Sequence, residues 1–204
     1  MSVFNYQTID KPAEGMYKEK GSRFLAFAYP VDNEGEVKAR LQELRKIYFD
    51  ARHHCFAWML GPEQKSFRAN DDGEPNHSAG DPILGQIRSK NLTNVLVVVV
   101  RYFGGVKLGV GGLIAAYKLA AEDALKNAII VEKEVLINFT IQYDYNATPE
   151  VMRMVKDFEL RISQQEFEDK CSMRGEMALK MKEKFVEKVV LLKALGTAVE
   201  IEIN

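Results

Sequence analysis

The strongest constraint on the fold is a stretch in the middle of the chain, where an apolar run is followed at once by glycines. Residues 95–100 read VLVVVV, and the next twelve residues, RYFGGVKLGVGG (101–112), contain five glycines. A β-prone run that is apolar on both faces predicts a central strand covered on both sides. After residue 112, apolar and charged residues segregate at helical spacing. We therefore expect the order strand, glycine-rich loop, helix.

The rest of the first half reads as mixed α and β structure. Asn33, followed three residues later by Glu36, forms a capping-box pattern that predicts the start of a helix. The segment 66–82 lacks periodicity and is rich in turn residues, so we expect a long loop, which in a small domain is usually functional or mobile. The other predicted elements are strands at 22–31 and 53–60, a helix at 34–49 and a short helix at 82–89.

The second part of the chain shows a cleaner pattern, which begins with strict alternation of apolar residues at 135–145. Thr148 and Pro149 then predict a helix start, and Gly196 predicts a helix end. The remaining expected elements are strands at 162–171 and 175–182 with a turn at 172–175, a helix at 184–195 and a strand at 197–203. This βαββαβ order predicts a ferredoxin-like domain. We place the domain boundary so that the domains span 1–131 and 132–204, an α+β protein.

Composition excludes several classes of protein. The 28 basic and 29 acidic residues leave a net charge of −1, which rules out attraction of the whole molecule to nucleic acid or lipid but leaves room for a local basic patch. Only Cys55 and Cys171 are present, so no disulfide framework fits and we expect a cytoplasmic protein. The start of the chain lacks the apolar stretch of a signal peptide, and no run is long enough to span a membrane.

The glycine-rich stretch is the sharpest candidate site. Its glycines allow main-chain N–H groups to approach a ligand, and the positive end of the following helix points to the same place. Arg101 and Lys107 add charge for a phosphate or carboxylate. The alternative is that the glycines serve only tight turns and close packing. The glycines are Gly104, Gly105, Gly109, Gly111 and Gly112.

The acidic loop offers a second hypothesis, a divalent cation. Asp71 and Asp72 are adjacent carboxylates, and oxygen ligands of this kind suit magnesium bridging to a phosphate. The same segment, DDGEP, is also ordinary turn material. We expect no cofactor, and magnesium is the one alternative that the acidic loop leaves open.

Three further residue groups bear on chemistry. If 53–60 is a strand, His53 and His54 point to opposite faces, so they do not share one metal ion. One of them can serve as a base or phosphate donor; the alternative is a histidine that packs at the strand end with its nitrogens satisfied locally. Cys55 reads as a core residue, because nothing nearby lowers its pKa. Basic and aromatic residues adjoin at Phe67 with Arg68 and again at 101–103, where they can bind phosphates and stack bases.

The segments ARHHCFAW (51–58), DDGEPNHSAGDPIL (71–84) and VVVVRYFGGVKLGVGGLIAAY (97–117) together resemble the IMPACT family, and the whole chain resembles its two-domain bacterial members. The resemblance implies a first domain similar to domain two of small-subunit ribosomal protein five, and a second domain similar to domain five of elongation factor G. It also implies a link to regulation of translation. The family-like positions are Arg23, Arg52, His53, His54, Asp71, Asp72, Gly73, Glu74, Pro75, Gly80, residues 101–105, Lys107, Gly109, Gly111 and Gly112.

Three functions remain open at this point. The first is binding of RNA or the ribosome through phosphates held by the glycine-rich stretch. The second is a magnesium-dependent enzyme acting on a phosphorylated small molecule, and the third is a module that binds a protein partner through an exposed sheet face of the second domain. The candidate phosphate-binding residues are Arg23, Arg52, His54, Arg68, Arg101, Gly104, Gly105, Lys107, Gly109, Gly111 and Gly112, and the candidate metal ligands are Asp71 and Asp72.

Overall fold

The structure, a computed structural model, describes residues 3–167 and 170–203. The chain divides into two compact units. The first unit is Asn5–Lys133, and the second begins at Glu134 and includes Phe4. The mixed α+β class predicted from the sequence is confirmed.

The first unit is built on a five-stranded antiparallel sheet. Its central strand β6 runs through residues 95–100 with every side chain fully buried, as the apolar run predicts. The strands, in their order across the sheet, are β2 (Ala13–Glu19), β3 (Ser22–Pro30), β6 (Val95–Tyr102), β4 (His53–Leu60) and β5 (Ser66–Asn70).

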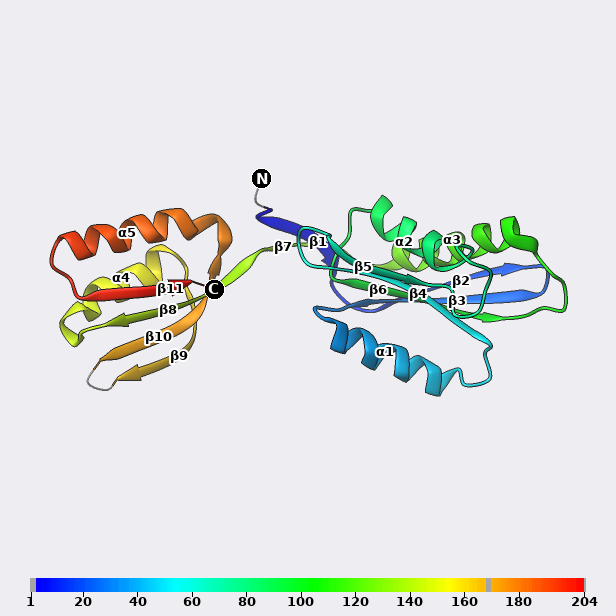
Figure 1. Cartoon of the computed structure of the whole chain (residues 1–204), viewed down its shortest axis with the longest axis horizontal. Helices are drawn as coiled ribbons and strands as arrows, with labels where there is room; N and C mark the ends of the chain where they lie inside the picture. Colours follow the sequence, from blue (N-terminus) through cyan, green and yellow to red (C-terminus); the bar gives the residue numbers. More distant parts are fainter. Residues whose placement is uncertain (1–2, 168–169, 204) are drawn as a thin grey trace. The chain divides into compact units, whose positions relative to one another are not determined.

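Helices cover both faces of this sheet (Figure 1). Helix α1 (Glu34–Ile47) packs on one face, where Val98 and Val100 point. Helices α2 (Gly80–Ser89) and α3 (Gly109–Asn127) pack on the other, over Val97 and Val99. The two faces of a strand carry alternate residues, so β6 needs apolar side chains at every position.

The capping box before α1 forms as predicted. The Asn33 side chain accepts a hydrogen bond from the Glu36 main-chain N–H at 3.0 Å, and the Glu36 carboxylate accepts one from the Asp32 N–H at 2.9 Å. These contacts satisfy N–H groups that have no partner inside the helix.

Two boundaries near the candidate site differ from the prediction. The expected loop at 66–82 is shorter, because Ser66–Asn70 forms edge strand β5 and α2 begins at Gly80. An edge strand with both faces mostly exposed has no apolar alternation to reveal it. Helix α3 begins at Gly109, so the last glycines of the stretch 101–112 lie in the first helical turn and the loop between β6 and α3 is only 103–108.

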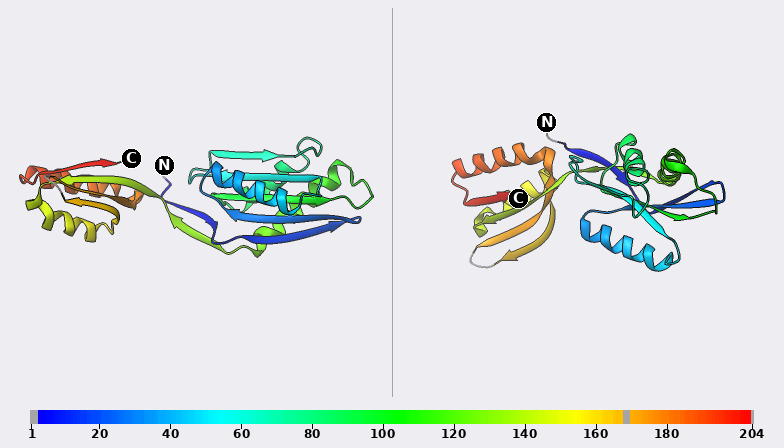
Figure 2. Two further views of the ribbon diagram at one scale, coloured as in Figure 1. Left: turned by 90° about the horizontal axis from the view of Figure 1, so that it is seen from below. Right: turned by 45° about the vertical axis from the view of Figure 1, so that its right-hand side comes forward.

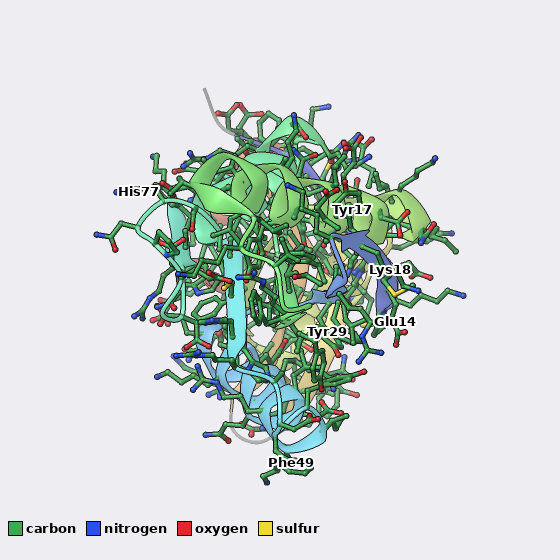
Figure 3. The ribbon with its side chains drawn as sticks, turned by 90° about the vertical axis from the view of Figure 1, so that its right-hand side faces the viewer. Glu14, Tyr17, Lys18, Tyr29, Phe49 and His77 are labelled. Atoms are coloured by element: carbon green, nitrogen blue, oxygen red, sulfur yellow. The ribbon has the colours of Figure 1, made fainter. Side chains whose placement is uncertain are left out.

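The sequence also failed to predict three strands of the first unit. Strand β1 (Asn5–Ile9) pairs with β7 (Ile130–Glu134) in a small separate sheet, and β2 forms the other edge of the main sheet. Glu14 and Lys18 project from β2 at the periphery of the unit (Figure 3). These strands are short or carry charged residues, which removes the signal that apolar alternation gives.

The second unit has the predicted βαββαβ order. Its antiparallel sheet has the order β11-β8-β10-β9, and both long helices lie on one face (Figure 2). The elements are β8 (Leu136–Tyr143), α4 (Thr148–Asp157), β9 (Arg161–Phe167), β10 (Cys171–Ala178), α5 (Lys182–Ala194) and β11 (Val199–Ile203), with single 3-10 turns at Tyr145–Ala147 and Leu179–Met181. Gly196 takes the left-handed conformation (φ 88°) just after α5, as predicted.

The predicted turn at 172–175 is wrong, because β10 runs through it from Cys171 to Ala178. Gly175 lies at a register shift between β10 and β9, and a Cβ there would come within 2.2 Å of the Arg161 carbonyl oxygen. The glycine therefore permits two strands to approach closely, a role that sequence inspection cannot separate from turn formation.

The face of this sheet that no helix covers is polar. Its exposed side chains on the central strands include Asn138, Gln142, Arg174 and Glu176. It is not the apolar sheet face on which the protein-binding hypothesis depends. Among the described residues, no helix is long and apolar enough to cross a membrane.

Candidate functional site

A pocket of about 420 Å³ opens in the first unit where β4 begins, β6 ends and α3 starts. Antiparallel pairing of β4 and β6 sets His53 directly opposite Arg101, and the loop after β5 carries Glu74 to the same place. The pocket is lined by Arg52, His53, Glu74, Pro75, Arg101, Phe103, Lys107, Leu108, Gly109, Val110 and Leu113.

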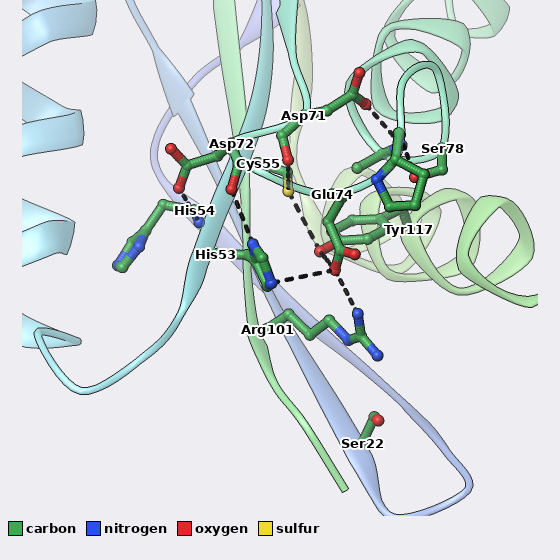
Figure 4. A network of polar contacts seen from close by, with 12 residues as sticks. Ser22, His53, His54, Cys55, Asp71, Asp72, Glu74, Ser78, Arg101 and Tyr117 are labelled. Atoms are coloured by element: carbon green, nitrogen blue, oxygen red, sulfur yellow. Dashed lines mark hydrogen bonds and ion pairs between the residues drawn. The ribbon is translucent and has the colours of Figure 1, made fainter. Parts of the chain in front are cut away.

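The Glu74 carboxylate is the centre of the buried polar contacts (Figure 4). One of its oxygens, Oε1, accepts hydrogen bonds from Arg101 Nη1 at 2.5 Å and from the Tyr117 hydroxyl at 2.8 Å. The side chains of Glu74 and Arg101 are only 5% and 8% exposed. A buried carboxylate requires such compensation, because burial without a partner carries a large penalty.

The Arg101 guanidinium is held in place yet only partly satisfied. It lies 5.4 Å from the centre of the Phe24 ring and 5.7 Å from that of Phe103, which restricts its movement. Its Nε is buried and finds no hydrogen-bond partner within residues 3–167 and 170–203. The guanidinium therefore has more N–H donors than the described residues satisfy.

The two histidines lie on opposite faces of the sheet, as predicted. His53 Nδ1 lies 2.8 Å from the Asp72 carbonyl oxygen, which can only accept, so Nδ1 carries a proton. Its Nε2 lies 4.0 Å from Glu74 Oε1 at the pocket wall. His54 instead points toward α1, and its burial lowers its pKa below the usual 6.5.

Cys55 is a core residue. Its thiol is fully buried and contacts the Asp71 carbonyl oxygen at 3.0 Å and the Tyr117 hydroxyl at 3.3 Å. Burial raises the pKa of the thiol and that of Tyr117. A thiol held in its neutral form is a poor nucleophile, in line with its interpretation from the sequence.

The two candidate metal ligands are occupied by contacts within the chain. Asp71 accepts hydrogen bonds from the main-chain N–H groups of residues 77, 79 and 80, and so holds the start of α2. Asp72 accepts from the His54 N–H at 2.7 Å and from Arg45 at 3.0 Å. The described residues contain no group of three potential metal-ligating His, Cys, Asp or Glu side chains. With their oxygens engaged in this way, these carboxylates do not fit a magnesium site.

The glycines of the stretch 101–112 serve different purposes. A Cβ on Gly104 would come within 2.0 Å of the Gly21 carbonyl carbon, so Gly104 permits a close approach of two chain segments. Gly105 and Gly109 have φ of 88° and 74°, which favours glycine. Gly111 and Gly112 lie in the first turn of α3, where no side chain caps the helix and no acidic residue is present.

The structure brings some of the predicted phosphate-binding residues together and not others. Arg52, Arg101, Lys107 and Gly109 line the pocket. Arg23 lies elsewhere, with its guanidinium 5.1 Å from the Tyr102 ring centre. The residues away from the pocket lining also include His54, Arg68, Gly104, Gly105, Gly111 and Gly112.

Several residues of the pocket were not among the predicted binding residues. Glu74 was named only among the family-like positions, and Tyr117, which contacts Glu74 but does not line the pocket, was not singled out. Both roles depend on a contact across the fold, since Glu74 and Tyr117 are 43 residues apart. Phe103, predicted within 101–103 as a stacking residue, and Val110, which was not singled out, are 57% and 53% exposed and form an apolar wall of the pocket. His77 lies at the periphery of the unit, 2.6 Å from Asp81 (Figure 3).

The chain was compared with protein-family models, with curated sequences and with solved structures, and each comparison finds a match. The model of the Impact N-terminal domain matches residues 20–125. The IMPACT family member YvyE of Bacillus subtilis is 34% identical over 143 residues, covering 70% of this chain and 66% of YvyE. The IMPACT family member YigZ of Escherichia coli is 38% identical over 129 residues, covering 62% of this chain and 63% of YigZ. These alignments span slightly less than two thirds of both relatives. A crystal structure described as a hypothetical protein has a TM-score of 0.77 and 27% identity, covering 98% of this chain and 97% of that one.

Proposed function

The chain belongs to the IMPACT family, and from this membership and the geometry of the pocket we propose that it binds RNA. The pocket of the first unit binds a phosphate group of the RNA. The observation that carries the proposal is Arg101, a nearly buried cation that lines the pocket and whose guanidinium makes only one hydrogen bond among the described residues, from Nη1 to Glu74. The guanidinium has five N–H donors in a planar arrangement, and phosphate oxygens are strong acceptors that arginine recognises.

The surroundings of Arg101 favour an anion. Arg52 and Lys107 line the same pocket and are exposed, so each can move toward a bound phosphate. The uncapped N-terminus of α3 contributes main-chain N–H groups and a partial positive charge. Glu74 pairs with Arg101, which leaves Arg52, Lys107 and the helix end without an opposing carboxylate among the residues that line the pocket. The local field is therefore positive although the whole chain is nearly neutral.

The apolar wall supports nucleic acid over a simple inorganic anion. Phe103 is 57% exposed and lies beside the Arg101 guanidinium. Exposed aromatic rings next to phosphate-binding cations are the usual means by which proteins stack unpaired bases. We assign RNA, and a cytoplasmic role in association with the ribosome, because the family resemblance implies a link to regulation of translation.

The proposal is tested with a short single-stranded RNA that carries a 5′-phosphate and a fluorophore at its 3′ end. Fluorescence anisotropy should report binding that weakens as salt rises from about 50 to 200 mM. If Arg52 and Lys107 each neutralise one phosphate charge, log K against log salt has a slope of about −1.4. Absence of binding at the lowest salt would overturn the proposal.

A matched pair of variants locates the binding. Lys107 precedes α3, whereas Lys126 lies in the last turn of the same helix, and both are exposed. Lys107→Ala should weaken binding and reduce the salt slope by about one phosphate contact. Lys126→Ala should leave both unchanged, since it lies at the opposite helix end. Equal effects of the two substitutions would show that binding follows general charge and not the pocket.

A further inference from the structure

We propose that the pocket is an end-recognition site, which takes a single 5′-nucleotide with its terminal phosphate and does not track along a strand. This inference rests on the proposed function, and it names the chemical group that the same pocket receives. The 5′-nucleotide can be the first residue of an RNA or a free nucleoside monophosphate.

The first argument is size. A cavity of about 420 Å³ falls at the lower end of the range of about 300–1000 Å³ that is typical of small-molecule sites. Proteins that hold single strands along their length use a groove that spans about 4–16 nucleotides per domain. The cations of this pocket lie within one hollow, bounded by the N-terminus of α3 and the loop that carries Glu74 and Pro75.

The second argument is depth. Arg101 lines the pocket and is only 7% exposed, so a phosphate must enter the pocket to reach its guanidinium. An internal phosphodiester has a nucleotide on each side, and both neighbours must find a way out of the pocket. A terminal phosphate has a nucleotide on one side only. Entry to a buried donor therefore favours a chain end.

The third argument is charge. Arg52, Arg101 and Lys107 carry three positive charges, and Glu74 carries one negative charge. A phosphomonoester carries a charge of about −1.5 to −2 at pH 7, whereas an internal phosphodiester carries only −1. The surplus of about two positive charges, together with the helix N-terminus, complements the monoester better.

The fourth argument is the position of the apolar wall. The Arg101 guanidinium and the exposed Phe103 ring are 5.7 Å apart, so the phosphate site and the stacking surface are adjacent. Val110 and Leu108 continue the apolar lining. This spacing suits one nucleotide, whose base lies against the ring while its phosphate meets the guanidinium.

The test compares two RNAs of identical sequence, with a 5′-monophosphate or a 5′-hydroxyl, by anisotropy on the full-length protein. The phosphorylated RNA should bind at least about tenfold more tightly, the effect of one charge-assisted contact. Lys107→Ala and Arg52→Ala should reduce this preference. Arg68→Ala, a cation on β5 outside the pocket, should leave the preference intact. These exposed lysine and arginine positions avoid the folding defect that a change at buried Arg101 can cause.

Free nucleotides distinguish the two sources of the group. If 5′-AMP raises the thermal stability of the protein and adenosine does not, while both RNAs fail to bind, the end-recognition inference stands for a free nucleotide and the RNA proposal fails. If both RNAs bind with equal affinity and 5′-AMP does not compete, RNA binding stands and the inference is overturned. If no RNA or nucleotide binds, both are overturned.

Discussion

Arg101 and Glu74 form an ion pair with an Nη1–Oε1 distance of 2.5 Å, although 27 residues separate them in the sequence. The pair joins the end of the central strand to the loop that follows β5. Tyr117 of α3 donates a second hydrogen bond to the same carboxylate oxygen. Three separate segments of the first unit therefore meet at one buried oxygen atom. The position of the pocket wall depends on these two hydrogen bonds to Glu74.

Glu74→Gln should destabilise the protein substantially. The substitution preserves shape but leaves the buried guanidinium without a counter-charge, and breaking a buried pair in this way costs about 3–5 kcal/mol. Urea denaturation measures the change. Glu63→Gln is the matched control, because Glu63 pairs with Lys65 at the exposed surface and should give no measurable change. Similar stabilities for the two variants would contradict the structural role of Glu74.

Gly104→Ala should reduce stability far more than Gly111→Ala. A Cβ at position 104 would lie 2.0 Å from the Gly21 carbonyl carbon and 2.1 Å from the Ser22 nitrogen, so the main chain must move. A Cβ at position 111 meets nothing within 4 Å, and alanine favours a helix over glycine. Thermal unfolding of both variants checks this difference, and a reversed order of melting temperatures would refute it.

Stability should fall as pH is lowered below about 6.5, in part through His54. Burial holds the pKa of His54 below its usual value of 6.5, so the unfolded state binds the proton more readily than the folded state. The contribution to stability is complete above the unfolded pKa and is lost as pH falls toward the folded pKa. One such proton changes stability by at most about 1.4 kcal/mol per pH unit.

His54→Phe isolates this effect. The aromatic ring keeps bulk against α1 without a titrating nitrogen. Denaturation curves between pH 5 and 8 should show a weaker pH dependence for the variant. An unchanged dependence would assign the effect to other groups.

Both cysteine thiols should resist labelling in the folded protein. Cys55 and Cys171 are 0% and 1% exposed. Burial also raises the pKa of the Cys55 thiol above its ordinary value, which reduces the reactive thiolate form. A thiol-specific reagent at mildly alkaline pH should react with neither in buffer and with both in urea. Cys171→Ala leaves Cys55 as the single thiol, so the labelling rate of this variant is the labelling rate of Cys55. Rapid labelling of that variant under native conditions would contradict the buried environment of Cys55.

Asp71→Ala should destabilise the protein to the same degree with or without magnesium. Asp71 accepts three main-chain N–H groups at the start of α2, and loss of such a cap costs about 1–2 kcal/mol. Denaturation is measured in magnesium and in a chelator. Asp81→Ala serves as a control on an exposed carboxylate that contacts only His77 among its described partners. A loss of stability that is larger in magnesium than in chelator would support the hypothesis that Asp71 binds magnesium.

The sequence predicted those parts of the fold whose signal is local. The central strand, the capping box at Asn33 and the βαββαβ order all follow from periodicity or from residues a few positions apart. The edge strands β2 and β5 did not, because an exposed strand has no apolar alternation. Gly175 misled for a related reason: a glycine that admits a neighbouring strand looks in sequence like a glycine in a turn.

The candidate site was predicted in part. The basic residues Arg52, Arg101 and Lys107, together with Gly109, carry chemistry that is visible residue by residue, and they line the pocket. The acidic loop was harder to interpret, since Asp71, Asp72 and Glu74 differ only in the donors that the fold brings to them. Two meet main-chain N–H groups and one meets Arg101 and Tyr117. Partners so distant in sequence leave no local pattern.

The pairing of β1 with β7 has a consequence for biosynthesis. Ile130, the first residue of β7, follows Ile9, the last residue of β1, by 121 positions. At an elongation rate of about 5–20 residues per second, β1 emerges some 6–24 seconds before its partner strand is made. During that interval the hydrogen-bonding edge of β1 in the nascent chain lacks its partner strand, and an unpaired edge of this kind is a template for pairing with another chain.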